Sequence, residues 1–113
     1  MANECLFCRI VRKEIPATIV AEYEDCIAFR DINPQAPVHV LVIPREHVAS
    51  LNEAPDERLV GRLHRVAAEL ARREGLSERG YRTVINTNAD AGQTVFHLHL
   101  HLLGGRRMTW PPG

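Results

Sequence analysis

The chain has 113 residues, of which 45% are hydrophobic and 25% charged, which is the length and apolar content of one domain spanning residues 1–113. Fourteen basic residues balance fourteen acidic ones, which excludes the strongly basic face of a general nucleic-acid binder. No apolar run has the length of a membrane span, and the first residues lack the layout of a signal peptide. We therefore expect a cytoplasmic protein with no nucleic-acid or membrane partner, whose three cysteines serve as thiols or metal ligands.

The first part of the chain predicts one short helix followed by three strands. Apolar residues at helical spacing predict a helix over residues 4–12, which ends before Pro16. Residues 18–22 and 26–30 are short β-prone runs, and Glu24 and Asp25 between them predict a hairpin turn. Residues 33–37 (NPQAP) predict a rigid loop, and residues 38–43 predict a buried strand that stops at Pro44.

The second part predicts one long helix and two more strands. Pro55 and Asp56 begin the helix and Gly75 ends it, with a buried stripe of Leu59, Leu63, Val66 and Leu70. Residues 81–85 and 95–103 predict strands, joined by a polar loop over residues 86–92. Five strands with local connections and segregated helices predict an α+β fold around an antiparallel sheet.

The last predicted strand carries three histidines, His97, His99 and His101, in strict alternation with leucines. Successive side chains of a strand point to opposite faces, so the pattern predicts three imidazoles on one open face of the sheet and the leucines in the core.

Three interpretations of this row remain open from the residues alone. The first is a solvated strand face. The second is a catalytic zinc site, although residues i and i+4 of a strand lie roughly 13 Å apart. The third is phosphoryl chemistry without a catalytic metal, in which one neutral imidazole attacks phosphorus and its neighbours manage charge and protons. Residues 91–94 (AGQT) favour the third, because a glycine, an amide and a hydroxyl can all serve a phosphate.

The pattern HLHLHLL at residues 97–103 resembles the signature of the histidine triad (HIT) superfamily. The resemblance extends to CLFC at residues 5–8, FRDINPQAPVH at 29–39, LVIP at 41–44, GQT at 92–94 and the tail GGRRMTWPPG at 104–113. That tail is similar to the branch of purine nucleoside phosphoramidases, and the three segments HLHLHLL, DINPQAPVH and WPPG together are a specific signal.

This resemblance implies an antiparallel sheet with two helices, continued across a homodimer into ten strands. It also implies hydrolysis of the P–N bond of purine nucleoside 5′-phosphoramidates, including aminoacyl and lysyl adducts of AMP. A nucleotidyl-histidine intermediate then yields AMP or GMP, with no catalytic metal.

The resemblance assigns roles to individual residues. His99 is the nucleophile, His101 contacts the phosphoryl oxygens and is our choice of donor to the leaving amine, His39 supports the triad, and the carbonyl of His97 orients His99. The remaining nucleotide-site positions surround the base (Phe7, Ile10, Phe29, Ile32), the ribose (Asp31) and the phosphate (Asn86, Gly92, Gln93, Thr94), and the tail residue Trp110 affects substrate choice. Thr94 stands where many members of this branch have serine, which can change the fit to the leaving group.

The CxxC of Cys5 and Cys8 has two interpretations of its own. A redox motif needs a thioredoxin-like βαβ context, which is missing, so the residues alone leave two half-buried thiols or a metal site. Some HIT proteins bind structural zinc through this CxxC, a histidine after the Ile-Pro dipeptide and the first triad histidine. The resemblance therefore implies zinc at Cys5, Cys8, His47 and His97.

Two alternatives to the phosphoramidase remain. One is a dinucleoside polyphosphate hydrolase of the same superfamily, which GQT at residues 92–94 would also suit and which the tail disfavours. The other is a non-enzymatic nucleotide-binding adaptor, which the presence of His99 disfavours.

Overall fold

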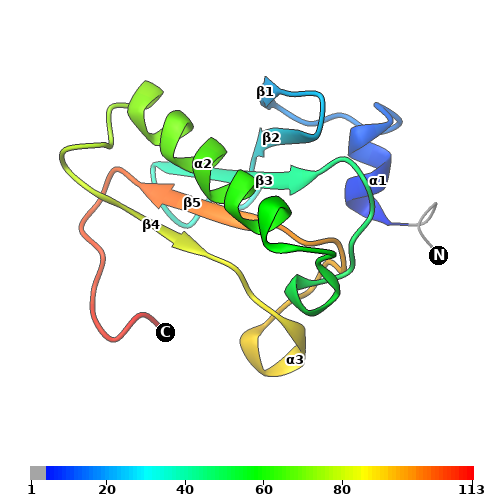
Figure 1. Ribbon diagram of the computed structural model, residues 1–113. Helices are drawn as coiled ribbons and strands as arrows, with labels where there is room; N and C mark the ends of the chain where they lie inside the picture. The colour runs from blue at the N-terminus through cyan, green and yellow to red at the C-terminus, as the bar shows by residue number, and fades with distance from the viewer. Residues whose placement is uncertain (1–4) are drawn as a thin grey trace.

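One five-stranded antiparallel sheet organises residues 5–113, the part of the chain that the computed structural model describes (Figure 1). The strands are β1 (Ile19–Glu22), β2 (Cys26–Arg30), β3 (Val38–Pro44), β4 (Tyr81–Val84) and β5 (Leu100–Gly104). Their order across the sheet is β1-β2-β3-β5-β4, so β1 and β4 form the two edges. The predicted α+β architecture and the hairpin at residues 18–30 are confirmed.

The helices are α1 (Leu6–Val11), α2 (Glu57–Arg73) and the single turn α3 (Asn88–Ala91), with a 3-10 turn, η2 (Leu51–Glu53). The two predicted helices are α1 and α2, and the predicted first residue of α1, Glu4, lies outside the described residues. The turn α3 falls in the segment predicted as a polar loop. Within residues 5–113, none of the helices has both the length and the apolar content needed to cross a bilayer.

The long helix α2 begins and ends where its sequence predicts. The side chain of Asp56 accepts hydrogen bonds from the backbone N–H groups of Arg58 and Leu59, which caps the first turn. Gly75 follows the last turn at a φ of +77°, the left-handed conformation that glycine adopts without strain. The predicted stripe is fully buried at Leu63, Val66 and Leu70 and partly buried at Leu59.

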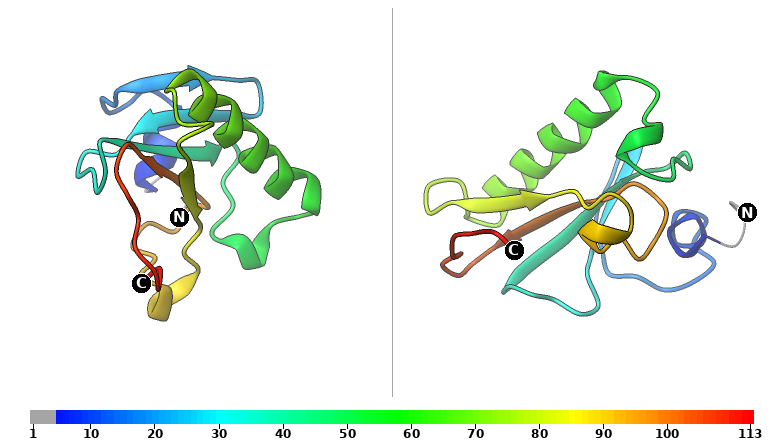
Figure 2. Two further views of the ribbon diagram at one scale, coloured as in Figure 1. Left: turned by 90° about the vertical axis from the view of Figure 1, so that its left-hand side faces the viewer. Right: turned by 90° about the horizontal axis from the view of Figure 1, so that it is seen from below.

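Alternation along the strands divides the apolar side chains between two packing layers. Ala28 of β2 and Val42 of β3 are paired and belong to the cluster that includes α2. Phe29 and Leu41, the next pair, belong to a second cluster with Phe7 of α1. The helices α2 and α1 thus cover opposite faces of the sheet (Figure 2).

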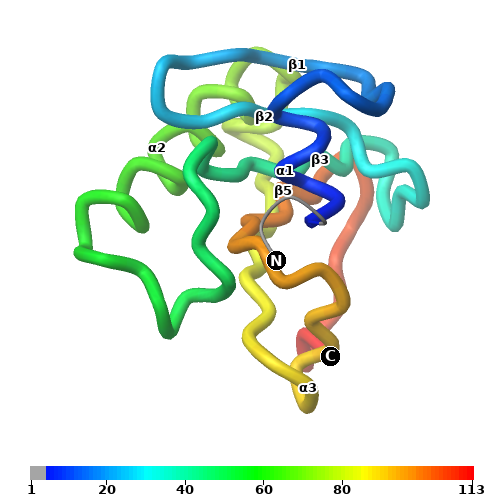
Figure 3. The backbone as a smooth tube through the Cα atoms, turned by 90° about the vertical axis from the view of Figure 1, so that its right-hand side faces the viewer, coloured from blue at the N-terminus to red at the C-terminus, as the bar shows by residue number. Residues whose placement is uncertain are grey.

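The predicted strand over residues 95–103 is wrong in its first half. The ladder between β3 and β5 begins at the pair of Val42 with Leu100, so His101 is the triad histidine that lies in a strand. The physical reason is Pro44, which has no N–H to donate to a ladder. Its carbonyl instead lies 2.8 Å from Nε2 of His97, and the N–H of Leu98 donates to the carbonyl of Val48. Residues 95–99 therefore leave the sheet and run beside α1, as the backbone trace shows (Figure 3).

Candidate active site and metal site

A pocket of about 300 Å³ opens between α1, the end of β2, the middle of β3 and the segment before β5. It brings together eight of the predicted nucleotide-site residues: Phe7, Ile10, Phe29, Asp31, Ile32, Thr94, His99 and His101. The aromatic walls are buried, whereas Ile32 at the rim is 97% exposed. An apolar slot that ends in imidazoles and one carboxylate suits a ligand with a flat base and a polar, charged end.

The His99 imidazole is held in one tautomer. Its Nδ1 lies 2.7 Å from the backbone carbonyl of His97, as the resemblance implied. A carbonyl can only accept, so Nδ1 carries the proton and Nε2 keeps its lone pair. The ring of Phe7 meets His99 edge-on, with centroids 5.1 Å apart, and limits its rotation. His99 thus borders the pocket as a neutral imidazole with a free nucleophilic nitrogen.

The tautomer of His101 is set through His39. The backbone N–H of Gln35 donates to Nδ1 of His39 over 3.0 Å, so the proton of neutral His39 is on Nε2. That Nε2 lies 2.9 Å from Nδ1 of His101 and 3.4 Å from Oδ2 of Asp31. His101 therefore accepts at Nδ1 and carries its own proton on Nε2, which is buried and has no partner within residues 5–113. A buried donor without a partner at the pocket calls for a ligand acceptor.

Burial keeps these rings neutral. It lowers the pKa of His101 to about 4, and the neighbouring His99 and His39 add to the effect. It also lowers the pKa values of His99 and His39, opposed in part by the nearby Asp31 carboxylate. Near neutral pH the site therefore presents a lone pair on His99 and an N–H donor on His101.

The remaining triad histidine, His97, faces away from the pocket toward a second group of side chains. Its Nε2 donates to the carbonyl of Pro44, so Nδ1 has the lone pair. This Nδ1 lies 3.4 Å from Sγ of Cys5 and 3.5 Å from Sγ of Cys8, and Nδ1 of His47 lies 3.2 Å from Sγ of Cys8. The prediction that three imidazoles share one open sheet face is therefore wrong, because His97 is fully buried and serves another cluster.

This second group fits a metal ion. The ligand atoms of Cys5, Cys8, His47 and His97 all lie within 4.8 Å of one another. Sulfur and nitrogen ligands of a tetrahedral zinc ion are separated by roughly 3.5 Å, which the observed contacts approach. Burial, together with Cys5, raises the pKa of Cys8 to about 11, so a cation is needed to hold this thiol as a thiolate.

Asp31, His39 and His101 form another compact group of metal-binding residue types, but its hydrogen bonds oppose metal binding. Nε2 of His39 carries the proton because Nδ1 accepts from Gln35, so the nitrogen that faces the group has no lone pair for an ion. The His97 site has the opposite tautomer, with the lone pair toward the sulfurs. The two clusters therefore differ in chemistry: the first suits proton transfer, and the second could hold a metal ion.

Three predicted phosphate contacts do not border the pocket. Gln93 is buried: its amide donates to the carbonyls of Ala49 and Val95, and its oxygen accepts from the N–H of Asn88. Gly92 caps α3 at a φ of +85°. Asn86 lies between β4 and α3 in the sequence and does not line the pocket. Their contacts with phosphate stay predictions, as does the role of Trp110, which is 82% exposed in the tail.

The sequence did not predict part of the apolar wall of the pocket. Leu6, residues 15–17, Arg30, Leu41 and Val95 also line the pocket. Leu41 could have been found, because it pairs with Phe29 between the neighbouring strands β2 and β3 and shares its face. Residues 15–17 carry no local signal of a site, since they approach it only through the turn that follows α1.

Comparisons with known proteins agree with this geometry. The family model of the HIT domain matches residues 12–108. A purine nucleoside phosphoramidase of Escherichia coli strain K12 is 49% identical, over 94% of this chain and 91% of the relative. A crystal structure of a HIT family hydrolase from Legionella pneumophila Philadelphia 1 is 56% identical, with a TM-score of 0.93 over 96% of this chain and 99% of that one. A Zn-bound histidine triad family protein from Mycobacterium smegmatis is 38% identical, with a TM-score of 0.83 over 94% and 78% of the two chains.

Proposed function

Because the chain belongs to the HIT domain family, we propose that it hydrolyses the P–N bond of purine nucleoside 5′-phosphoramidates, such as aminoacyl or lysyl adducts of AMP, and releases AMP or GMP. The observation that carries this proposal is one pocket that contains both a free Nε2 lone pair on His99 and an unpartnered Nε2–H on His101. A nucleophile beside a donor for the phosphoryl oxygens is the arrangement that two-step phosphoryl transfer needs.

The first step displaces the amine. Nε2 of His99 attacks phosphorus, the P–N bond breaks, its electron pair stays with nitrogen, and the amine leaves with a proton. His101 donates its Nε2–H to a phosphoryl oxygen as negative charge builds up. Its low pKa disfavours the protonated form in the free site, but a bound phosphoryl group raises that pKa and allows His101 to supply the proton of the amine.

The second step regenerates the free enzyme. A water molecule attacks the phosphorus of nucleotidyl-His99 and gives one proton to His101, which replaces the proton that His101 passed to the amine. The P–N bond to the ring breaks, its electron pair returns to Nε2 of His99, and the nucleoside monophosphate leaves. The carbonyl of His97 accepts from Nδ1–H of His99 and so stabilises the ring while it carries positive charge. Asp31 borders the pocket and can accept hydrogen bonds from the ribose hydroxyls, and the Phe7 and Phe29 rings suit the purine.

We also propose that Cys5, Cys8, His47 and His97 hold structural zinc, which supplies a closed tetrahedral cross-link and takes no part in the reaction. The supporting observation is the lone pair of His97 Nδ1, which faces both sulfurs. Free thiols at this site suit a reducing compartment, which supports a cytoplasmic location. The free edge of the sheet at β4 supports a homodimer with a continuous sheet.

A substrate panel tests the proposed reaction against the polyphosphate hydrolase. The kcat/KM for an adenosine 5′-phosphoramidate of a primary amine is expected to exceed that for a diadenosine polyphosphate by at least about a hundredfold, because the relative that is 49% identical to this chain is a purine nucleoside phosphoramidase. A higher kcat/KM for the polyphosphate would show that the protein is a dinucleoside polyphosphate hydrolase instead.

A further inference from the structure

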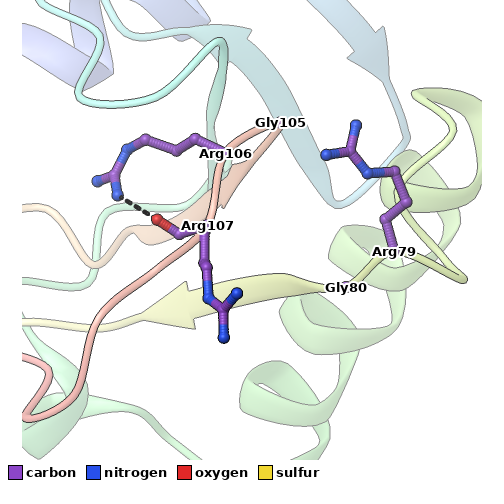
Figure 4. A pocket seen from close by; sticks show the side chains of 5 residues that line it. All are labelled: Arg79, Gly80, Gly105, Arg106 and Arg107. Atoms are coloured by element: carbon purple, nitrogen blue, oxygen red, sulfur yellow. Dashed lines mark hydrogen bonds between the residues drawn. The ribbon is translucent and has the colours of Figure 1, made fainter.

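Arg106 lies directly after the glycines that end β5 and reaches across to another loop. Its Nε donates to the backbone carbonyl of Gln35 over 3.0 Å, and its Nη1 donates to the carbonyl of Arg107 over 3.1 Å. Arg106 borders a pocket with Arg79 and Arg107, but the three guanidinium groups point apart and do not form a common anion site (Figure 4). The hydrogen bonds of Arg106 instead link two backbone segments, the loop that contains Gln35 and the chain after β5.

The loop that Arg106 contacts, residues 33–37, packs closely against the end of β5. Gly105 adopts a φ of +90°, and a Cβ built on it would lie 2.9 Å from Cβ of Pro37. The loop thus meets the chain after β5 twice, through Pro37 at Gly105 and through Gln35 at Arg106. These contacts leave little freedom for the Gln35 peptide groups.

Gln35 is also the residue that sets the tautomer of His39. Its N–H donates to Nδ1 of His39, and Nε2 of His39 then faces Nδ1 of His101. A displaced Gln35 would free Nδ1 of His39 to take the proton. Nε2 of His39 would then have to accept, His101 would place its proton on Nδ1, and its Nε2–H donor toward the pocket would be lost.

We propose that Arg106 is a positioning residue for the phosphoryl transfer, acting through Gln35 and His39 to keep the Nε2–H of His101 directed at the substrate. The expected effect of Arg106 on the reaction rate rests on the proposed function. Its expected effect on the tautomers of His39 and His101 rests only on the hydrogen bonds. Arg106 is exposed, so its replacement leaves the core intact.

The test compares Arg106→Met, which keeps the aliphatic stem and removes the donors, with Arg107→Met as the matched control. Arg107 contributes its carbonyl, which the substitution retains. Arg106→Met is expected to lower kcat about fivefold with little change in KM, because the lost donor acts on the transition state. Arg106→Lys is expected to recover most of the rate, since an ammonium group can also donate to the Gln35 carbonyl.

Long-range proton–nitrogen NMR spectra of the imidazole rings give the second readout. The wild type and Arg107→Met are expected to show a protonated Nε2 on both His39 and His101, and Arg106→Met a mixture of tautomers. Spectra and kcat of Arg106→Met that match those of Arg107→Met would overturn the inference. Arg106→Gln, whose shorter amide does not reach Gln35, replaces Arg106→Met if the latter does not fold. If the wild type does not cleave phosphoramidates, the proposed function fails, and the spectra still decide the role of Arg106.

Discussion

At the residue scale, His101 has a buried N–H donor that finds no hydrogen-bond acceptor among residues 5–113. Its Nε2 is buried, and its Nδ1 is occupied by His39. His101→Ala is expected to lower kcat by about 10²–10³-fold, the usual cost of one preorganised donor to a developing oxyanion. Steady-state turnover of the phosphoramidate measures this, with His64→Ala on the exposed face of α2 as the control. A kcat for His101→Ala within about threefold of the control would remove His101 from the mechanism.

The same burial predicts the acid side of the pH profile. The pKa values of His99 and His101 lie below that of free imidazole, that of His101 at about 4. Protonation removes the lone pair of His99, so activity is lost as pH falls, and the lowered pKa moves this loss to lower pH. We expect kcat/KM to stay constant until the pH is below about 6.5, the ordinary histidine value. An acid limb centred above that value in a pH series would contradict the assigned neutral rings.

At the scale of elements, two glycines lead to opposite predictions for the same substitution. A Cβ on Gly104 of β5 would lie 2.5 Å from Cδ1 of the buried Leu76, so Gly104→Ala is expected to destabilise the fold by about 1–3 kcal/mol through overpacking. A Cβ on Gly61 of α2 meets nothing within 4 Å, so Gly61→Ala is expected to stabilise it by up to about 1 kcal/mol. Denaturant unfolding measures both, and equal effects of one sign would show that β5 and Leu76 do not pack as described.

The elements also show how far the sequence was informative. The boundaries of α2, β2 and β3 follow from local signals, namely Asp56, Gly75 and the β-prone runs. The alternation of histidine with leucine predicts a strand as far back as residue 95, although residues 95–99 lie outside the sheet. Alternation reports which residues are apolar, whereas a strand also needs a partner with free N–H groups, and that partner ends at Pro44.

The site was predictable to a similar extent. The family pattern identified the residues of both clusters, including His39 and His47, which are far from the triad in sequence. It also assigned the His97 carbonyl to the orientation of His99, and this contact is observed. It did not identify the carbonyl of Pro44 or the N–H of Gln35, which set the tautomers of His97 and His39. Every residue has a backbone carbonyl, so the residue types alone do not show which of these groups contacts a histidine.

At the scale of the whole molecule, the proposed metal site joins three segments that are distant in the sequence. Cys5 and Cys8 come from the start of α1, His47 from the loop after β3, and His97 from the segment before β5. Removal of zinc by a chelator is therefore expected to lower the melting temperature by on the order of 10 °C, since several kcal/mol of binding free energy would be lost. Calorimetry of the wild type with and without chelator measures this.

Cys8→Ser provides the control for the metal. This variant is expected to melt near the temperature of the chelated wild type and to be insensitive to the chelator, because one ligand of the closed site is missing. Zinc content is determined on the same samples. A wild type that contains no zinc after purification and does not change its melting temperature when zinc is added would refute the metal site.

Kinetics of a His99 variant can decide whether His99 is the nucleophile of a phosphoramidase. Turnover of a fluorogenic adenosine 5′-phosphoramidate is followed for the wild type and His99→Ala, and AMP affinity is measured for both by calorimetry. We predict that the variant binds AMP with similar affinity and loses at least about 10⁴-fold in kcat, the scale of loss when a catalytic nucleophile is removed. A wild type that binds AMP without turnover, or a His99→Ala variant that retains turnover, would contradict the account.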